Sequence, residues 1–196
     1  MSTRLVNDGY GQLELNQVAF RRDGRIEAQC KLGVLKDANN HDVDYVENGM
    51  LLAVNKVAGT VGYPTGTDAN ELIGLHYSAE TLYDERQQGL KYFKLDRNGF
   101  LPRIGYLAVG DRFTTNCVIY NDATFPKASE NDTTTAKDRI KKAIAEGTVY
   151  GVPSVTGEIE LVKSTGISTW GVVLQAVAYT TMPDGQDAIK FVVIKA

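Results

Sequence analysis

Apolar and polar positions alternate most clearly near the C-terminus. In 158–162 and 188–194 the apolar side chains occupy every second position, which is the period of a strand with one buried face. The run 169–179 is apolar almost throughout, so we expect a strand inside the sheet with both faces covered. Pro183-Asp184-Gly185 supplies a tight turn before the last strand. This pattern predicts three strands that place the end of the chain in the core, and none of them carries reactive chemistry.

Shorter patterns of the same kind recur along the rest of the chain. Alternation over 11–35, interrupted near Asp23-Gly24, predicts a hairpin, since Asp-Gly between alternating runs is a strong local turn signal. Further short strands are expected at 49–54, 72–77, 106–109 and 113–120. Many short strands separated by glycine-rich turns indicate a mainly β protein.

One segment has helical spacing. Ile140, Ala143 and Ile144 recur at the helical period, Thr135 is among the N-cap candidates, and Gly147 is a suitable stop. We therefore expect a helix over about 135–146. Its apolar face is narrow and basic side chains flank it, which favours a short helix on the side of a sheet over a basic recognition helix. The predicted fold class is mainly β, a β-barrel or β-sandwich with one short peripheral α-helix.

The chain length allows two domain organisations. With 196 residues there is room for one sizeable domain or two small ones. We expect a single β-rich domain over 1–196. The alternative is an N-terminal β domain over 1–120, followed by a C-terminal β subdomain with the helix over 121–196.

The segment 80–103 follows neither period and is rich in aromatic and arginine side chains. Long irregular excursions from a compact β domain are commonly functional, and these residue types dominate interface hot spots. The segment is either a protein interface or a loop folded back so that Tyr92, Phe93 and Phe100 plug the end of the barrel. The candidate interface residues are Tyr83, Arg86, Tyr92, Phe93, Phe100 and Arg103.

Charge and composition narrow the choice of partner. The chain has 21 Lys and Arg against 24 Asp and Glu, a net charge of -3, which gives no electrostatic footprint for nucleic acid or an anionic membrane. No apolar run approaches the roughly 18 residues that span a bilayer, so we expect a soluble protein whose partners are proteins. Cys30 and Cys117 match no metal or redox spacing, and two buried reduced thiols are favoured over a disulfide.

Motifs of the common enzyme classes do not occur. The sequence has no Gly-x-Ser-x-Gly elbow, no phosphate-binding loop, no Gly-x-Gly-x-x-Gly after a strand and no His-Glu-x-x-His. His41 lies in a polar loop and His76 in a predicted strand, so a catalytic triad or a histidine metal site would need partners from scattered positions. We predict no catalytic residue, no bound cofactor and no metal.

Two groups of carboxylates bear on that prediction. Asp37, Asn39, Asp42 and Asp44 resemble a loose calcium loop, but the sixth position lacks glycine and the twelfth is Asn rather than Glu, so solvated turn carboxylates are preferred. Asp84-Glu85 offers a pair for glycoside hydrolysis, but adjacency in sequence does not define the separation in space that such chemistry needs. A carbohydrate-active site stays an alternative.

The C-terminal strand pattern also carries a family resemblance. Its parts are Val155-Thr156-Gly157-Glu158-Ile159-Glu160-Leu161, Trp170-Gly171-Val172-Val173-Leu174-Gln175-Ala176-Val177, Gly185 and the closing strand 188–194. These segments resemble tailed-bacteriophage capsid decoration proteins, also called cement or head auxiliary proteins, in which a small β-barrel closes with such strands. The segment 80–103 and the helix at 135–146 have no counterpart in the resemblance.

The resemblance implies a structural virion protein without enzymatic activity. Such a protein, made in the host cytoplasm, binds the outer surface of a phage capsid and stabilises the shell or anchors a head fibre. The implied partners are the major capsid protein and either a second copy of the chain or a head fibre protein. Two alternatives are a carbohydrate-binding or carbohydrate-active β domain, because exposed tyrosines and carboxylates on β scaffolds also serve sugars, and a head-to-tail connector component.

Overall fold

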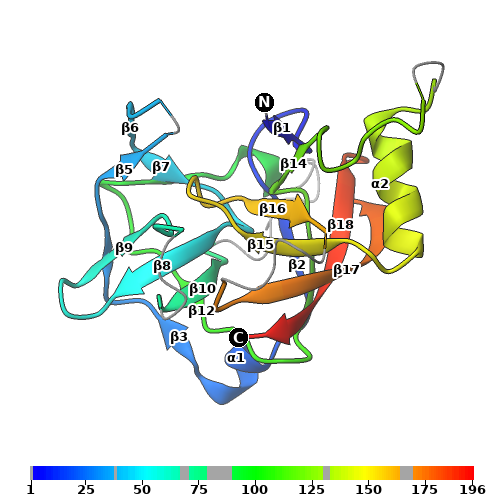
Figure 1. Ribbon diagram of the computed structural model, residues 1–196. Coiled ribbons are helices and arrows are strands. Elements are labelled where there is room, and N and C mark those ends of the chain that lie inside the picture. Colours follow the sequence, from blue (N-terminus) through cyan, green and yellow to red (C-terminus); the bar gives the residue numbers. More distant parts are fainter. Residues whose placement is uncertain (1, 38, 67–70, 79–89, 130–132, 164–169) are drawn as a thin grey trace.

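The computed structural model describes residues 2–37, 39–66, 71–78, 90–129, 133–163 and 170–196. Within these residues the chain is mainly β, as the sequence predicts, with two multi-stranded mixed sheets, two smaller sheets and two α-helices (Figure 1). The strands in the described part of the chain form no closed barrel. The fold is therefore built around two open sheets.

The larger sheet contains both ends of the chain. Its strands, in spatial order, are β1 (Ser2–Arg4), β14 (Val118–Asn121), β16 (Ile159–Val162), β15 (Tyr150–Pro153), β17 (Val173–Thr181), β18 (Asp187–Lys195), β13 (Arg112–Thr115) and β2 (Leu13–Gln17). Neighbouring strands are antiparallel except β14 and β16, which are parallel. The N-terminal strand thus forms one edge of a sheet whose centre comes from the C-terminal part of the chain.

The three strands predicted near the C-terminus are confirmed as β16, β17 and β18. Ile189, Phe191 and Val193 are buried at alternate positions of β18. The expectation that β17 is covered on both faces is wrong for its second half, where Val177 is 46% exposed. Strand β17 is longer than its neighbour β15 and pairs with it only near Gln175. Its second half therefore continues past β15 with β18 as its paired strand, at the margin of the sheet.

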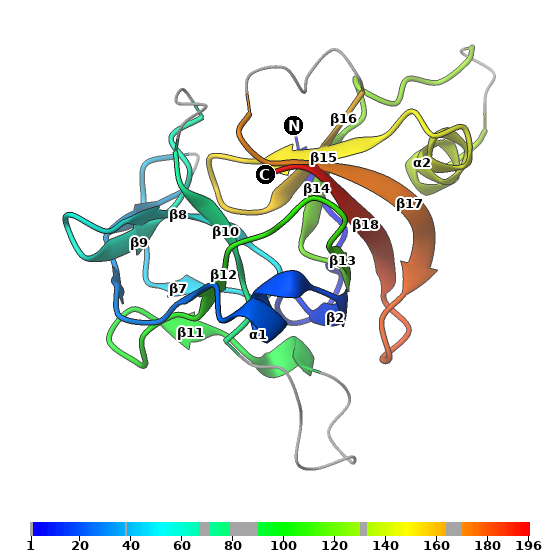
Figure 2. The same ribbon diagram turned by 90° about the horizontal axis from the view of Figure 1, so that it is seen from below.

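The smaller sheet lies to one side of the larger one (Figure 2). Its strands, in order, are β3 (Ile26–Glu27), β12 (Ile104–Gly105), β10 (Ile73–His76), β8 (Leu51–Asn55), β9 (Thr60–Gly62) and β4 (Lys31–Leu32). The two smaller sheets each contain two strands. One pairs β7 (Tyr45–Val46) with β11 (Leu95–Asp96), and the other pairs β5 (Leu35–Lys36) with β6 (Asp42–Val43).

Strand β8 has core residues on both faces because successive side chains point in opposite directions. Leu51 packs in a cluster with Phe113, Ile159 and Phe191 of the larger sheet. Leu52, the next residue, packs in a second cluster formed largely by the smaller sheet and the β7–β11 pair. Strand β8 therefore joins the two cores.

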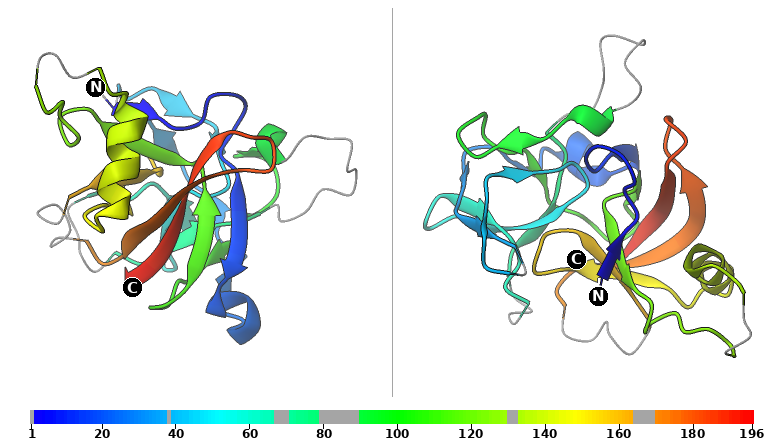
Figure 3. Two further views of the ribbon diagram at one scale, coloured as in Figure 1. Left: turned by 90° about the vertical axis from the view of Figure 1, so that its right-hand side faces the viewer. Right: turned by 90° about the horizontal axis from the view of Figure 1, so that it is seen from above.

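The predicted helix is confirmed as α2 (Ala136–Ala145). Thr135 caps its N-terminus, with Oγ1 accepting a hydrogen bond from the Asp138 backbone N–H at 3.1 Å, and Gly147 follows its end with φ of 70°. Ile140 and Ile144 are buried, and the helix packs against β17 (Figure 3). It is a peripheral helix on the side of the sheet.

The hairpin expected over 11–35 is wrong. Strand β2 pairs with β13 and β3 pairs with β12, and the short helix α1 (Ala19–Asp23) lies between β2 and β3. The Asp23-Gly24 pair ends a helix instead of forming a hairpin turn, since Gly24 caps α1 in the left-handed conformation with φ of 68°. The helical turn buries Phe20 against Gly105, where an added Cβ would lie 2.5 Å from the ring.

Two other expected strands differ in extent. The run 106–109 forms no strand, since β12 ends at Gly105, and the run 113–120 divides into β13 and β14. Asn116 lies at the division, where its Oδ1 accepts a hydrogen bond from the Gln12 backbone N–H at 2.6 Å. This contact turns the chain out of one strand and into the next.

Strand β18 provides a test of the shared core. Phe191 is fully buried, with its ring centroid 5.8 Å from that of Phe113. We expect Phe191→Ala to lower the free energy of unfolding by about 3–5 kcal/mol, because it leaves a cavity between the sheets. Ile194→Ala, on the same strand but 39% exposed, should cost about 1 kcal/mol or less. Urea denaturation of both variants measures this, and equal losses would contradict the assigned core.

Candidate functional site

The structure describes four of the six candidate interface residues. Tyr83 and Arg86 lie outside the described residues, as does the Asp84-Glu85 pair. Tyr92 is 65% exposed, Phe100 is 87% exposed, and Arg103 is also exposed. Phe93 alone of these four packs inward, against the second core cluster. Two of the three rings considered as a plug are therefore at the surface.

The backbone near Tyr92 is fastened to the N-terminal segment. The short 3-10 helix η1 (Leu90–Tyr92) contains Lys91, whose carbonyl accepts a hydrogen bond from the Tyr10 backbone N–H at 2.6 Å. Its Nζ donates to Asp8 Oδ2, also at 2.6 Å. Gly9 has φ of 75°, and a Cβ there would lie 2.3 Å from the Lys91 carbonyl oxygen. This close approach requires glycine at position 9, and it fixes the backbone position from which the Tyr92 side chain extends.

The other end of the segment is fastened as well. The Arg103 backbone N–H donates to Ser78 Oγ at 3.0 Å, and the Arg103 carbonyl accepts from the Tyr77 backbone N–H at 3.0 Å. Pro102 is buried next to it. Exposed Phe100 and Leu101 therefore precede a backbone position that the body of the protein holds.

A second group, which the sequence did not predict, is a charged cluster formed by Arg4 on β1 and two carboxylates from connections between strands. Glu47 is 1% exposed, and its Oε2 accepts hydrogen bonds from Arg4 Nη2 and from the Gly11 backbone N–H, each at 2.6 Å. Arg4 Nε lies 3.4 Å from Glu158 Oε1. One guanidinium is thus shared by two buried carboxylates, one just after β7 and one just before β16. We call these three residues the Arg4 cluster.

His76 connects the Arg4 cluster to the fastened end at Arg103. Its Nδ1 lies 2.7 Å from the Glu47 carbonyl oxygen and its Nε2 lies 2.6 Å from Ser78 Oγ. A carbonyl only accepts, so Nδ1 carries the proton and Nε2 accepts from the Ser78 hydroxyl. His76 is fully buried, and burial lowers its pKa to about 4, so the ring is neutral at pH 7.

A cavity of about 550 Å³ opens beside the Arg4 cluster. Its floor is the face of the larger sheet, where Arg4 pairs across from Ile119 and Ile119 across from Glu160. Burial raises the pKa of the Glu160 carboxyl. The remaining lining comprises Ser2, Asp37, Asn39, Val43, Tyr45, Glu47, Met50, Tyr63, Ser154, Val155, Thr156, Glu158 and Trp170. Polar and aromatic side chains from the larger sheet, from β7 and from connecting segments therefore line one space.

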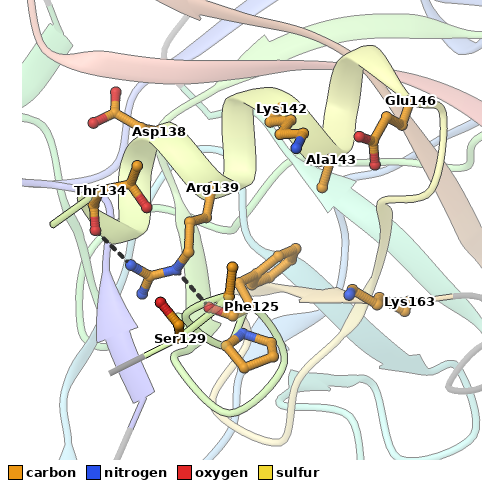
Figure 4. A pocket seen from close by; sticks show the side chains of 11 residues that line it. Phe125, Ser129, Thr134, Asp138, Arg139, Lys142, Ala143, Glu146 and Lys163 are labelled. Carbon is orange, nitrogen blue, oxygen red and sulfur yellow. Dashed lines mark hydrogen bonds between the residues drawn. The ribbon is translucent and has the colours of Figure 1, made fainter. Parts of the chain in front are cut away.

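A separate pocket of about 570 Å³ lies beside α2 (Figure 4). Arg139 Nε donates to the Phe125 carbonyl and its Nη1 to the Thr134 carbonyl, each at 2.7 Å. The guanidinium is thus used to hold the chain before the helix against the helix itself. Lys142 and Lys163 complete a lining that also includes acidic side chains, and no single charge dominates it.

The remaining polar candidates have local structural roles. Asp37 Oδ1 accepts hydrogen bonds from the backbone N–H groups of Asn39 and His41, each at 2.8 Å, and Asp42 pairs with Lys36. These are the turn carboxylates preferred over a calcium loop. In the described ranges, no group of three or more His, Cys, Asp or Glu side chains is arranged to hold a metal ion.

The prediction for the cysteines is confirmed. Cys30 and Cys117 are both free and both buried, and burial raises the pKa of each thiol. They pack in the second core cluster as small apolar side chains.

Sequence reasoning missed the Arg4 cluster because its members are far apart along the chain. The alternation at 158–162 predicts that Glu158 and Glu160 share the polar face of a strand, and the structure places both beside the cavity. Arg4 and Glu47 carry no such pattern. Their pairing depends on β1 being added to the edge of the larger sheet.

Comparisons with known proteins add no relative. No family model, curated protein or solved structure matches the chain. Of the helices that the structure describes, none is long and apolar enough to cross a membrane.

His76 should make stability depend on pH. The unfolded histidine binds a proton near pH 6.5, but the folded one resists protonation until about pH 4. Its contribution is complete above pH 6.5 and is lost as the pH falls toward 4. We expect the loss of unfolding free energy between pH 7 and pH 4 to be about 2–3 kcal/mol smaller in His76→Gln than in the parent protein.

Urea denaturation of both proteins across this range measures the difference. The carboxylates titrate in both proteins, so they cancel in the comparison. Parallel pH profiles would contradict a buried neutral His76.

Proposed function

We propose that the protein is a structural virion protein that binds the outer surface of a phage capsid through the segment around Tyr92 and Phe100. The observation that carries this proposal is a pair of exposed rings on a fastened backbone. Phe100 is 87% exposed and Tyr92 is 65% exposed, while Lys91 and Arg103 are hydrogen-bonded to the body of the protein on either side.

Exposed aromatic side chains of this kind favour an interface. A phenylalanine and a neighbouring leucine that face water add nothing to the stability of the folded protein. When a partner buries them, they contribute to the free energy of binding as interface anchors. Leu101 is 47% exposed directly beside Phe100, and the exposed Arg103 follows two residues later. Aromatic residues and arginine are the types enriched at interface hot spots.

The fastened backbone strengthens the same argument. Ordering a loop on binding subtracts from affinity, and a segment already held in place avoids part of that cost. The hydrogen bonds at Tyr10, Lys91, Ser78 and Arg103 hold the chain where the exposed residues begin and end. A protein that clamps neighbouring subunits requires its contact residues to be held in fixed positions.

The engagement of the reactive side chains supports a structural role over an enzymatic one. Glu47, His76 and Arg139 each make hydrogen bonds that hold segments of this chain together. Neither cysteine is exposed. In the proposal, the partner is the major capsid protein, and a second copy of the chain or a head fibre protein is a further partner on the capsid exterior.

Binding of purified variants to capsid shells of the same virus tests this proposal. We expect Tyr92→Ala, Phe100→Ala and Arg103→Ala each to weaken co-sedimentation with the shells by about 1–4 kcal/mol. The melting temperature of the isolated protein should stay unchanged for Phe100→Ala and Arg103→Ala, because those side chains are exposed.

Val57→Ala is the matched control. Val57 is 101% exposed in the β8–β9 turn, which Figure 2 shows well apart from β11, the strand that precedes Phe100. It should change neither binding nor melting. Unchanged binding in all three test variants would remove this segment from the interface, and a parent protein that fails to bind the shells would reject the proposed function.

A further inference from the structure

The cavity beside the Arg4 cluster has more acidic groups than its own basic group can balance. Its lining contains Asp37, Glu47, Glu158 and Glu160 against a single guanidinium, Arg4. Glu47 and Glu158 share that guanidinium at 2.6 Å and 3.4 Å. The Arg4 cluster therefore retains net negative charge before the other two carboxylates are considered.

Glu160 takes part in none of the ion pairs among the residues that the structure describes, whereas Glu47 and Glu158 pair with Arg4. It lies two strands away from Arg4 along one cross-strand row, a separation of about 10 Å at ordinary strand spacing. Burial is the cause of its raised pKa, and no cation within the described ranges of the chain offsets that effect. A partly buried carboxylate without a cationic partner favours the arrival of one.

Aromatic side chains form much of the remaining wall. Tyr45, Tyr63 and Trp170 all line the cavity, and Tyr and Trp faces attract cations. The Tyr45 ring already has the ammonium of Lys94 5.0 Å from its centroid. The charge of Lys94 is paired with Asp96 at 3.0 Å, so it does not neutralise the cavity.

We propose that this cavity receives a lysine or arginine side chain of a partner polypeptide, with Glu160 as the main ionic contact and Trp170 and Tyr63 as its aromatic walls. The proposal stands on charge complementarity and on the aromatic lining, and it does not depend on binding to a capsid. An anionic guest is opposed by the excess of carboxylates. A neutral sugar would use the aromatic walls but would leave Glu160 uncompensated.

Trp170 makes the test direct because it is the single tryptophan of the chain and lines the cavity. Its fluorescence should change saturably on titration with Nα-acetyl-lysinamide or Nα-acetyl-argininamide, and the response should weaken as salt is added. Nα-acetyl-glutaminamide and glucose at the same concentrations are the neutral probes, and they should give no saturable change.

Two substitutions complete the design. Glu160→Gln keeps the shape of the side chain and should weaken binding of the cationic probes about fivefold. Glu146→Gln is the matched control, at the C-cap of α2 and outside this cavity, and should leave binding unchanged. Circular dichroism spectra that match the parent confirm that both variants fold.

Three results would overturn the proposal. They are the absence of a saturable response to the cationic probes, an equal response to the neutral amide, and cation binding that survives Glu160→Gln unaltered. A response to glucose alone would instead assign the cavity to carbohydrate. Capsid co-sedimentation is measured separately, so either proposal can fail without the other.

Discussion

The two sheets are joined through one buried residue, Glu47, whose side chain and backbone carbonyl both accept hydrogen bonds. Glu47 accepts hydrogen bonds from Arg4 on the edge strand β1 and from the backbone at Gly11, while its own carbonyl accepts from His76 on β10. An ionised carboxylate that is 1% exposed loses its hydration, which costs several kcal/mol unless partners replace the water. These partners come from parts of the chain that meet only in the folded protein, so the carboxylate is satisfied only when β1 and the segment at Gly11 are in place.

The backbone around Glu47 follows from that constraint. Gly49 has φ of 87°, and a Cβ there would lie 2.2 Å from Thr115 Oγ1, so the chain passes directly against the β13–β14 connection. Leu51 then donates its backbone N–H to the Gly157 carbonyl at 2.8 Å, which places β8 beside the turn that leads into β16. Strand β8 can enter both cores because its approach is fixed in this way.

Local patterns predicted what local chemistry determines. Alternation identified β16 and β18, and capping residues with helical spacing identified α2, because each signal is contained within the element itself. The Asp23-Gly24 signal was ambiguous because a left-handed glycine ends a helix as readily as it closes a hairpin, and burial of Phe20 decided between them. The hairpin prediction failed because the outcome depends on tertiary packing, which the local sequence does not contain.

The two candidate sites also differ in how far the local sequence predicts them. The aromatic content of 80–103 was visible in the sequence, but which rings face water depends on packing, and Phe93 turns inward while Phe100 does not. The Arg4 cluster left no local trace except the polar face of β16. Its formation requires β1 to pair with β14 and β14 with β16 in a defined register, and nonlocal register is not encoded in any single segment.

A charged junction does more here than stabilise the fold. Well-packed apolar residues of similar volume often hold two elements together as strongly as a buried ion pair, so stability alone does not explain the Arg4 cluster. Charged partners do impose direction, since Glu47 is satisfied only when Arg4, Gly11 and their strands adopt one arrangement. The same arrangement keeps the space beside the cluster polar, since Glu158 and Glu160 line it together with Tyr45, Tyr63 and Trp170. The contact that positions β1 against Glu47 therefore also forms part of the wall of the acidic cavity.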